Sequence, residues 1–334
     1  MKKKLKFNKW TGGTVLAGLS LASIPALGQE AENLETSEVP VASQQEMQGV
    51  NANANANVTG LQTVTGNASV SQQFYSKLKH HDFGFSITRF GLGVKAPWVI
   101  NDQWRLDSSL QYRFDYWNWN FIPSTGPVTS APWQNINTLT WAEIASYKLD
   151  DTWTIYGGGF ARSSADSDVG FFKGFTGGGL AGFNYKVDEN LSLGAGLAIM
   201  TQIKDHKQIL PIITAKWKFA DDWRLDVGLT DVATQGYGAD VKWLYDDAWT
   251  FDFGIQYHNS RFRISTINQG VGQEKASLLY AGATWHATPM VDVNGFAGIA
   301  VGGVVKAYNN SGSEVFYNKY DPALVIGVKA ALRF

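Results

Sequence analysis

Histidine and serine residues are the first places where chemistry could occur in this sequence of 334 residues. The histidines are scattered along the chain, at His80, His81, His206, His258 and His286. Ser260 lies close to His258 on the same side of an extended strand, but such a spacing occurs freely by chance. His80 and His81 stand beside Asp82 without a third ligand nearby, so a solvated loop explains them better than a metal site. The sequence therefore predicts no catalytic, metal or cofactor site, and an enzyme is not expected.

Glycine-rich runs at 157–159, 177–179 and 298–303 invite comparison with phosphate-binding loops. They fit neither the G-x-x-x-x-G-K-[ST] pattern nor a strand followed by a helix, so close packing of strands explains them better. The chain has no cysteine, which excludes disulfides, thiolate metal sites, cysteine nucleophiles and a lipoprotein anchor. Its formal net charge of -1 gives no electrostatic reason to expect a nucleic-acid partner.

The last eleven residues, 324–334, alternate between two kinds of side chain. Lys329 and Arg333 fall on one side of an extended strand, because side chains alternate with period two. The other side is apolar and consists of Leu324, Ile326, Val328, Ala330, Leu332 and Phe334. A chain that ends on an aromatic residue in such a strand resembles the closing strand of bacterial outer-membrane β-barrels of the porin-like superfamily. The resemblance implies an outer-membrane location in a Gram-negative cell, and it implies that Phe334 belongs to the signal read by the barrel assembly machinery.

The first 66 residues are expected to lie outside the barrel. Residues 1–28 combine a basic start, an apolar stretch and a small-residue ending, which predicts a secretory signal peptide. A transmembrane helix is the weaker alternative, because about 20 apolar residues are needed. Residues 29–66 carry few large apolar side chains and include the repeat NANANAN, so we expect a disordered periplasmic linker, with a plug inside the barrel as the alternative.

A pattern of short turns followed by alternating strands recurs along residues 67–334. Its six copies are VINDQWRLDSSL, KLDDTWTIYGGG, KVDENLSLGAGL, KFADDWRLDVGL, LYDDAWTFDFGI and HATPMVDVNGFA. Asp and Asn favour tight turns, so each copy predicts a hairpin. With an opening strand near 68–76 and the closing strand, we expect an all-β transmembrane antiparallel up-and-down barrel of about fourteen strands, with twelve as the alternative. A β-propeller is less favoured, because its blade signatures are missing.

Tryptophan residues gather beside these turns. Rings with one polar edge favour the bilayer interface, so the sequence predicts a girdle at the periplasmic rim rather than a soluble core. The expected girdle residues are Trp98, Trp104, Trp153, Trp217, Trp223, Trp243, Trp249 and Trp285. The longer connections, near 77–83, 118–135, 164–173, 202–208, 232–236, 264–275 and 308–320, would then be extracellular.

Charged residues fall mainly on the strand face opposite the apolar one, which in a barrel faces the lumen. The residues expected to line the lumen are Arg105, Asp107, Arg113, Asp115, Lys216, Lys218, Arg224, Asp226, Asp240, Lys242 and Asp252. Glu143 breaks the rule, because it shares the phase of Trp141; it lies near a rim or marks a bulge. The apolar phase also shifts between Ile87 and Phe90, so a bulge is possible at Arg89.

A mixed-charge lumen leads to one functional hypothesis and two alternatives. The leading hypothesis is a passive pore for small polar solutes, because about fourteen strands can leave space inside. The first alternative is a closed structural or surface-binding barrel that uses the aromatic segment 117–121 as its contact. The second is a transporter of apolar substrates that resembles the fourteen-stranded fatty-acid channels, which would need an apolar interior.

Overall fold

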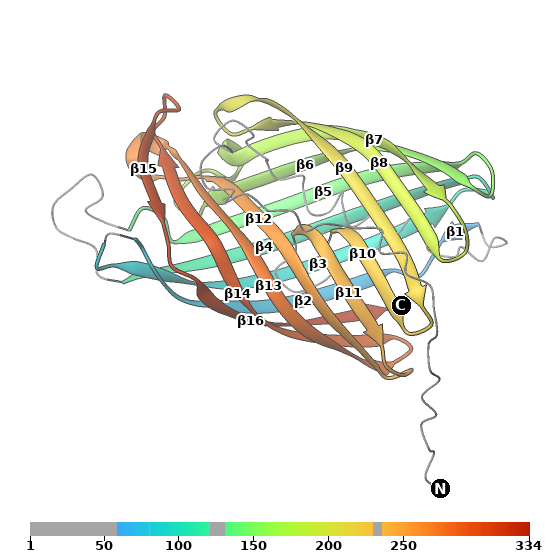
Figure 1. Ribbon diagram of the computed structural model, residues 1–334. Helices are drawn as coiled ribbons and strands as arrows, with labels where there is room; N and C mark the ends of the chain where they lie inside the picture. Colours follow the sequence, from blue (N-terminus) through green and yellow to red (C-terminus); the bar gives the residue numbers. More distant parts are fainter. Residues whose placement is uncertain (1–58, 80, 121–130, 230–235) are drawn as a thin grey trace, which may run out of the picture. The chain divides into compact units, whose positions relative to one another are not determined.

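The computed structural model describes residues 59–79, 81–120, 131–229 and 236–334. Within these residues, fourteen antiparallel strands form a closed up-and-down β-barrel, which confirms the expected fold class and strand number (Figure 1). The barrel strands are β2 (Thr65–Lys77), β3 (Gly84–Val99), β4 (Trp104–Asn120), β5 (Asn135–Lys148), β6 (Trp153–Asp166), β7 (Phe175–Lys186), β8 (Leu191–Gln202), β9 (Asp205–Ala220), β10 (Trp223–Leu229), β11 (Tyr237–Leu244), β12 (Trp249–Arg263), β13 (Val271–Thr288), β14 (Val291–Tyr308) and β16 (Ala323–Arg333).

Four short elements accompany the barrel. Strand β1 (Gly60–Leu61) pairs with β3, and β15 (Glu314–Lys319) pairs with the end of β14. The 3-10 helix η2 (Phe171–Gly174) and the helix α2 (Thr266–Gln269) lie in connections between strands. No helix in the described part of the chain has the length and apolar character needed to cross a membrane. The described residues do not include the predicted signal peptide, 1–28, or most of the predicted linker, 29–66. The alternative that the linker is a plug therefore concerns residues outside the described part of the chain.

The barrel is closed by its first and last strands. Strand β16 pairs antiparallel with β2, from Val325 opposite Gln73 to Arg333 opposite Thr65. Beyond this ladder, the backbone N–H of Phe334 donates to Val64 O at 2.9 Å, and Val64 N–H donates to Phe334 O at 2.8 Å. The final residue therefore extends the seam that joins the two ends of the sheet.

Six short turns connect strand pairs at one end of the barrel, at the positions that the recurring pattern predicts. In four of them, one Asp or Asn side chain accepts hydrogen bonds from the backbone two and three residues later. Asn101 accepts from Trp104 N–H at 2.8 Å, Asp150 from Trp153 at 2.7 Å, Asp188 from Leu191 at 2.8 Å and Asp246 from Trp249 at 2.7 Å. This bond fixes the chain reversal locally, which explains why the turns are readable in the sequence.

The opposite end differs from the expected loops in several places. The connection expected at 202–208 is shorter, because β9 begins at Asp205, and the one expected at 308–320 contains β15. The connection expected at 264–275 is shorter, because β13 begins at Val271. The aromatic segment 117–121 was expected in a loop, but β4 continues to Asn120, and Trp117 and Trp119 are 1% and 8% exposed. Their side chains are packed in the interior, so this part of the predicted surface contact is wrong; Phe121 lies outside the described residues.

The two sequence irregularities are not bulges in their own strands. Strand β5 pairs without interruption on both sides, and Glu143 lies on its outward face beside Trp141, where its carboxylate accepts a hydrogen bond from Ser108 Oγ at 2.7 Å. Strand β3 is also continuous against β4; Ile87 and Arg89 both point inward, and the register shift lies on β2. The apparent change of phase arises because part of the interior is apolar.

Candidate functional site: the barrel lumen

The predicted lumen residues form ion pairs along the inner wall. Within single strands, Arg105 pairs with Asp107 at 2.7 Å and Arg224 with Asp226 at 2.9 Å, because residues two apart share a face. Lys242 of β11 bridges strands, at 3.0 Å from Asp226 and 3.4 Å from Asp240. These carboxylates are almost fully buried, so the pairs lie inside the barrel rather than on its surface.

Other expected lumen residues continue this wall. Lys216 stands opposite Asp226 in the β9–β10 ladder, and Asp252 stands opposite Lys242 in the β11–β12 ladder. Lys218 differs, because its side chain is exposed close to a short turn, where its backbone N–H donates to Asn190 O at 2.8 Å. Positive and negative groups therefore alternate around the half of the lumen nearer the short turns, which creates local fields across the passage.

One predicted pair reaches across the lumen. Arg113 of β4 pairs with Asp115 at 3.1 Å, and its Nη2 also donates to Ser260 Oγ of β12 at 2.8 Å. Ser260 is thus held by an arginine, whereas His258 lies 3.4 Å from the carboxylate of Glu274. The two side chains that could have formed a Ser–His arrangement have different partners. Within the described ranges, no group of three or more His, Asp or Glu residues could hold a metal ion.

An aromatic cluster occupies the lumen toward the longer loops, and sequence reasoning missed it. Trp117 lies 4.9 Å from Phe85, 5.4 Å from Trp133 and 6.3 Å from Phe262 between ring centroids. Phe262 belongs to β12, so the cluster joins walls that are far apart along the sheet. Trp119, a further member of the cluster, donates a hydrogen bond through Nε1 to Trp133 O at 2.8 Å. This half of the lumen therefore contains an aromatic cluster beside buried charged groups such as Asp166 and Arg263, and the expectation of a charged lumen did not include the cluster.

A second buried apolar cluster follows the inner faces of β5 to β9. Its members are Ala142, Ile144, Tyr156, Phe160, Leu180, Ala198, Met200, Leu210 and Ile212. Glycines on the neighbouring strands make room for the two rings: a side chain at Gly182 or Gly196 would meet Tyr156 Oη, and one at Gly178 would meet Phe160. Gly178, which belongs to one of the glycine-rich runs, thus leaves space for an aromatic side chain, in agreement with a packing role.

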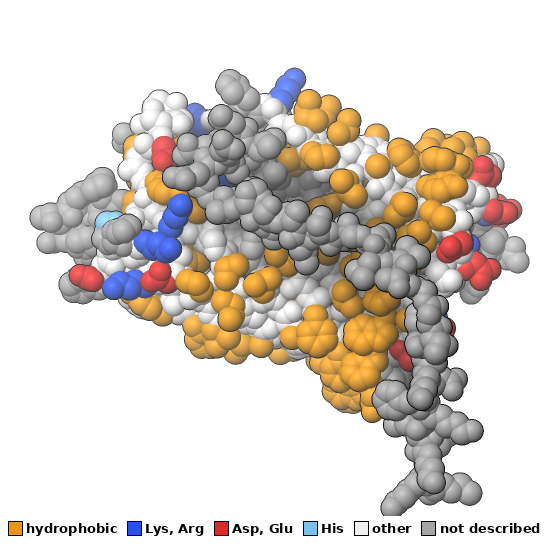
Figure 2. All heavy atoms as spheres, in the orientation of Figure 1, with side chains coloured by type: hydrophobic (Ala, Val, Ile, Leu, Met, Phe, Trp, Pro, Cys, Tyr) orange, Lys and Arg blue, Asp and Glu red, His pale blue; other side chains and the backbone are white. Residues whose placement is uncertain are grey.

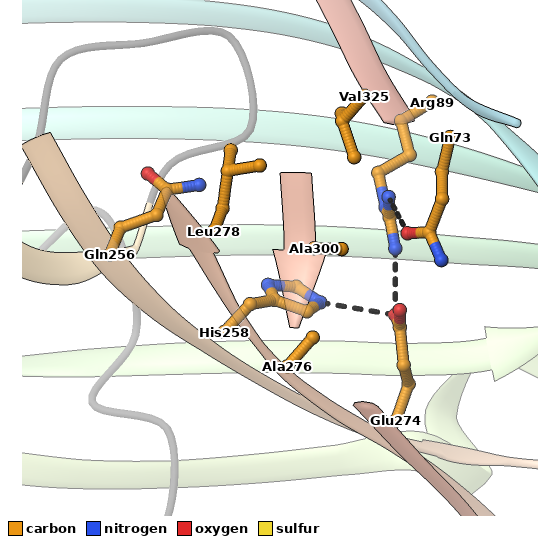
Figure 3. A pocket seen from close by; sticks show the side chains of 9 residues that line it. All are labelled: Gln73, Arg89, Gln256, His258, Glu274, Ala276, Leu278, Ala300 and Val325. Carbon is orange, nitrogen blue, oxygen red and sulfur yellow. Dashed lines mark hydrogen bonds and ion pairs between the residues drawn. The ribbon is translucent and has the colours of Figure 1, made fainter. Parts of the chain in front are cut away.

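Between the charged and aromatic halves, a buried polar group adjoins a small cavity (Figure 3). Glu274 of β13 accepts a hydrogen bond from Arg89 Nη2 of β3 at 2.7 Å and from Tyr320 Oη at 3.2 Å, and Arg89 Nη1 donates to Gln73 at 3.3 Å. Figure 3 shows the carboxylate between Arg89 and His258. The cavity of about 20 Å³ has room for about one water molecule. Its apolar side is formed by Ala276, Leu278, Ala300 and Val325.

The outer face carries an apolar belt with tryptophans near the short turns. In Figure 2, hydrophobic side chains cover much of the visible flank, and charged side chains gather toward its two ends. Trp249 and Trp285 stack at 6.3 Å, Trp223 and Trp243 stack at 5.9 Å, and each pair is adjacent across a ladder. The other expected girdle residues, Trp98, Trp104, Trp153 and Trp217, are between 39% and 46% exposed. A closed barrel with such a belt is an outer-membrane protein.

Comparisons with known proteins find similarity among solved structures but not among sequences. No family model matches the sequence, and no curated protein sequence matches it. Among solved structures, the Ralstonia pickettii toluene transporter TbuX has a TM-score of 0.48 and 10% identity over 82% of this chain and 90% of its own. A Pseudomonas aeruginosa FadL homologue has a TM-score of 0.45 and 12% identity over 82% of this chain and 90% of its own. An outer membrane channel from Pseudomonas putida F1 has a TM-score of 0.45 and 10% identity over 85% of this chain and 98% of its own.

Proposed function

We propose that the barrel is a passive outer-membrane channel for small polar solutes that carry an apolar part. The observation that supports this proposal is the division of one lumen into a charged half and an aromatic half. A solute with only charged groups would lose hydration beside the rings of Trp117 and Phe262. A purely apolar solute would have to pass ion pairs such as Arg224–Asp226. A molecule with both kinds of surface meets a favourable partner in each half.

Conductance tests the channel first. The protein spanning 29–334 is refolded, its folded state is checked by the mobility shift that folded barrels show on heating, and it is inserted in a planar bilayer. Discrete steps with an ion preference would support a channel. If the folded protein never conducts, the closed structural barrel becomes the better account, which the packed aromatic half of the lumen already favours as the second candidate.

The lumen charges are tested by changing their balance. The double variant Lys216→Gln and Lys242→Gln removes two positive groups from the charged half, so we expect the ion preference to move toward cations. Reversal potentials in a salt gradient measure that preference. The control is Lys79→Gln, which removes one positive charge from an exposed position beyond β2, so the shifts are compared per charge removed. An equal shift in the control would mean that the lumen charges do not set the preference.

A further inference from the structure

We infer that the ends of β12 and β13, residues 259–276, are a gate of the channel and that the Arg89–Glu274 ion pair is its latch. This inference rests on the proposed function, because a gate has meaning only in a barrel that conducts. In a barrel wall, successive residues of a strand face the lumen and the membrane in turn, so only every second residue is expected to be buried. At the ends of β12 and β13, consecutive residues are buried on both faces, among them Asn259, Ser260, Phe262, Arg263, Gly272, Gln273 and Glu274. This segment is therefore covered by protein on both faces, while its residues 271–275 remain paired with β14.

Contacts from several parts of the wall hold the segment in place. Arg261 of β12 donates through Nη1 to Gln202 of β8 at 2.9 Å, and Arg263 pairs with Ala165 of β6 in a parallel bridge. At the tip of the hairpin, Lys173 Nζ donates to Gln269 at 3.3 Å, and Thr266 Oγ1 donates to Pro132 O. Strands β6, β8 and β12 are separated by other strands around the barrel. These contacts therefore span the lumen and close the mouth.

The wall contains the features that a hinge requires. In the described part of the chain, pairing between β11 and β12 ends at Tyr237 opposite Tyr257, just before the gate begins. On the other side, the register of β13 against β14 shifts between Lys275 and Ser277. The extra residue is on β14, where Gly302 has a φ of 64°. A bulge with glycine in the left-handed region bends a strand and increases its twist, so the sheet changes direction at this level.

The latch joins the gate to β3, which is separated from β13 by three strands of the barrel, through buried charges. Glu274 is 1% exposed and belongs to the gate, whereas Arg89 belongs to β3. The adjoining cavity gives a water molecule access to the pair, which lets the two charges separate without complete dehydration. Arg263 is 6% exposed, and within the described residues its Nη2 donates to Asn310 while its Nε and Nη1 find no hydrogen-bond partner. An opened gate would expose these two donors to water.

A disulfide can test whether this segment moves. Ala165 and Arg263 are directly paired, which brings their Cα atoms within the range that a disulfide spans, and the chain has no native cysteine to interfere. The double variant Ala165→Cys and Arg263→Cys is inserted in a planar bilayer in its oxidised form and then reduced. We expect the oxidised protein to be silent and the reduced protein to show conductance steps. The control pair, Ala281→Cys and Ala297→Cys, joins β13 to β14 on the outer wall and should conduct in both states.

The outcomes separate the gate from the channel. Equal conductance of the oxidised and reduced gate variant overturns the gate and leaves the channel intact. Silence of the wild type and of every variant, although all are folded, overturns the proposed function and the gate with it.

A single substitution gives an independent reading of the latch. Glu274→Gln removes one charge-assisted hydrogen bond from the closed form, so the ratio of open to closed time should rise on the order of tenfold. The matched control is Glu143→Gln, which changes the same chemical group on the outer face and should leave gating unchanged. An unchanged ratio in folded Glu274→Gln would show that the ion pair is not the latch.

Discussion

Glu143 lies on the membrane-facing side of a strand that otherwise presents Leu139, Trp141 and Tyr147 outward. Its carboxylate is hydrogen-bonded by Ser108, and the residue on the other neighbouring strand is Gly159, which offers no side chain to cover it. A charged group that faces hydrocarbon is destabilising, and more so toward the middle of the bilayer. At the scale of one residue, this position therefore works against barrel stability.

Replacement of this carboxylate should stabilise the barrel. Glu143→Leu is expected to raise the free energy of unfolding by about 1–2 kcal/mol, because an apolar group replaces a charge on the lipid-facing surface. Reversible denaturant unfolding in lipid vesicles measures the change. Glu143→Gln, which keeps a hydrogen-bond acceptor for Ser108, should give a smaller gain. A lower stability of Glu143→Leu would mean that the carboxylate has a favourable partner on this face.

The residues that sequence reasoning missed escaped it for different reasons. Arg89 and Ile87 lie on the same inward face, but the apolar Ile87 suggested a membrane-facing position because the interior was assumed to be charged. Glu274 fell within the loop expected at 264–275. Pairs such as Arg105–Asp107 were identified because they are two residues apart in one strand. Contacts such as Arg89–Glu274 join residues 185 positions apart, and no local pattern reveals them.

At the scale of the elements, the strands near the short turns could be predicted because neighbouring residues in the sequence determine their faces and their turns. Period-two alternation gives the faces, and one Asp or Asn gives each turn. The ends of β12 and β13 could not be predicted in this way. Their inward course depends on where β11 ends and where β14 bends, and these events occur in other strands.

The bend in β14 depends on a glycine with positive φ. Gly302→Ala should lower the free energy of unfolding by about 1–2 kcal/mol, because a side chain is strained in the left-handed region. Gly295→Ala is the control in the same strand: its φ is not positive and a Cβ there would meet nothing within 4 Å. Denaturant unfolding in vesicles compares the two variants. Equal effects would show that the backbone conformation at Gly302 is not limiting.

At the scale of the whole molecule, we expect Phe334 to contribute to assembly. Phe334 is 62% exposed, while its backbone is paired with Val64 and its ring lies 3.6 Å from the position of a Cβ on Gly66. Deletion of Phe334 should reduce the amount of folded barrel in the outer membrane, because we expect the ring to be part of the signal for the assembly machinery. Quantitative blotting of membrane fractions measures this amount, and Leu332→Ala is the control for loss of apolar area in the same strand. Equal amounts of wild type and deletion variant would contradict the prediction.

The seam between β16 and β2 has a consequence for how the protein comes into being. These strands stand at opposite ends of the barrel sequence. Each supplies backbone hydrogen-bond partners to the other, from Thr65 opposite Arg333 to Gln73 opposite Val325. Until β16 has paired with β2, the edge of β2 that faces the seam is open, and an open strand edge invites pairing with other chains. Ring closure across so long a segment is slow relative to local hairpin formation. Hairpins can therefore form early, whereas the ring itself is an all-or-none event that no shortened product of synthesis can complete.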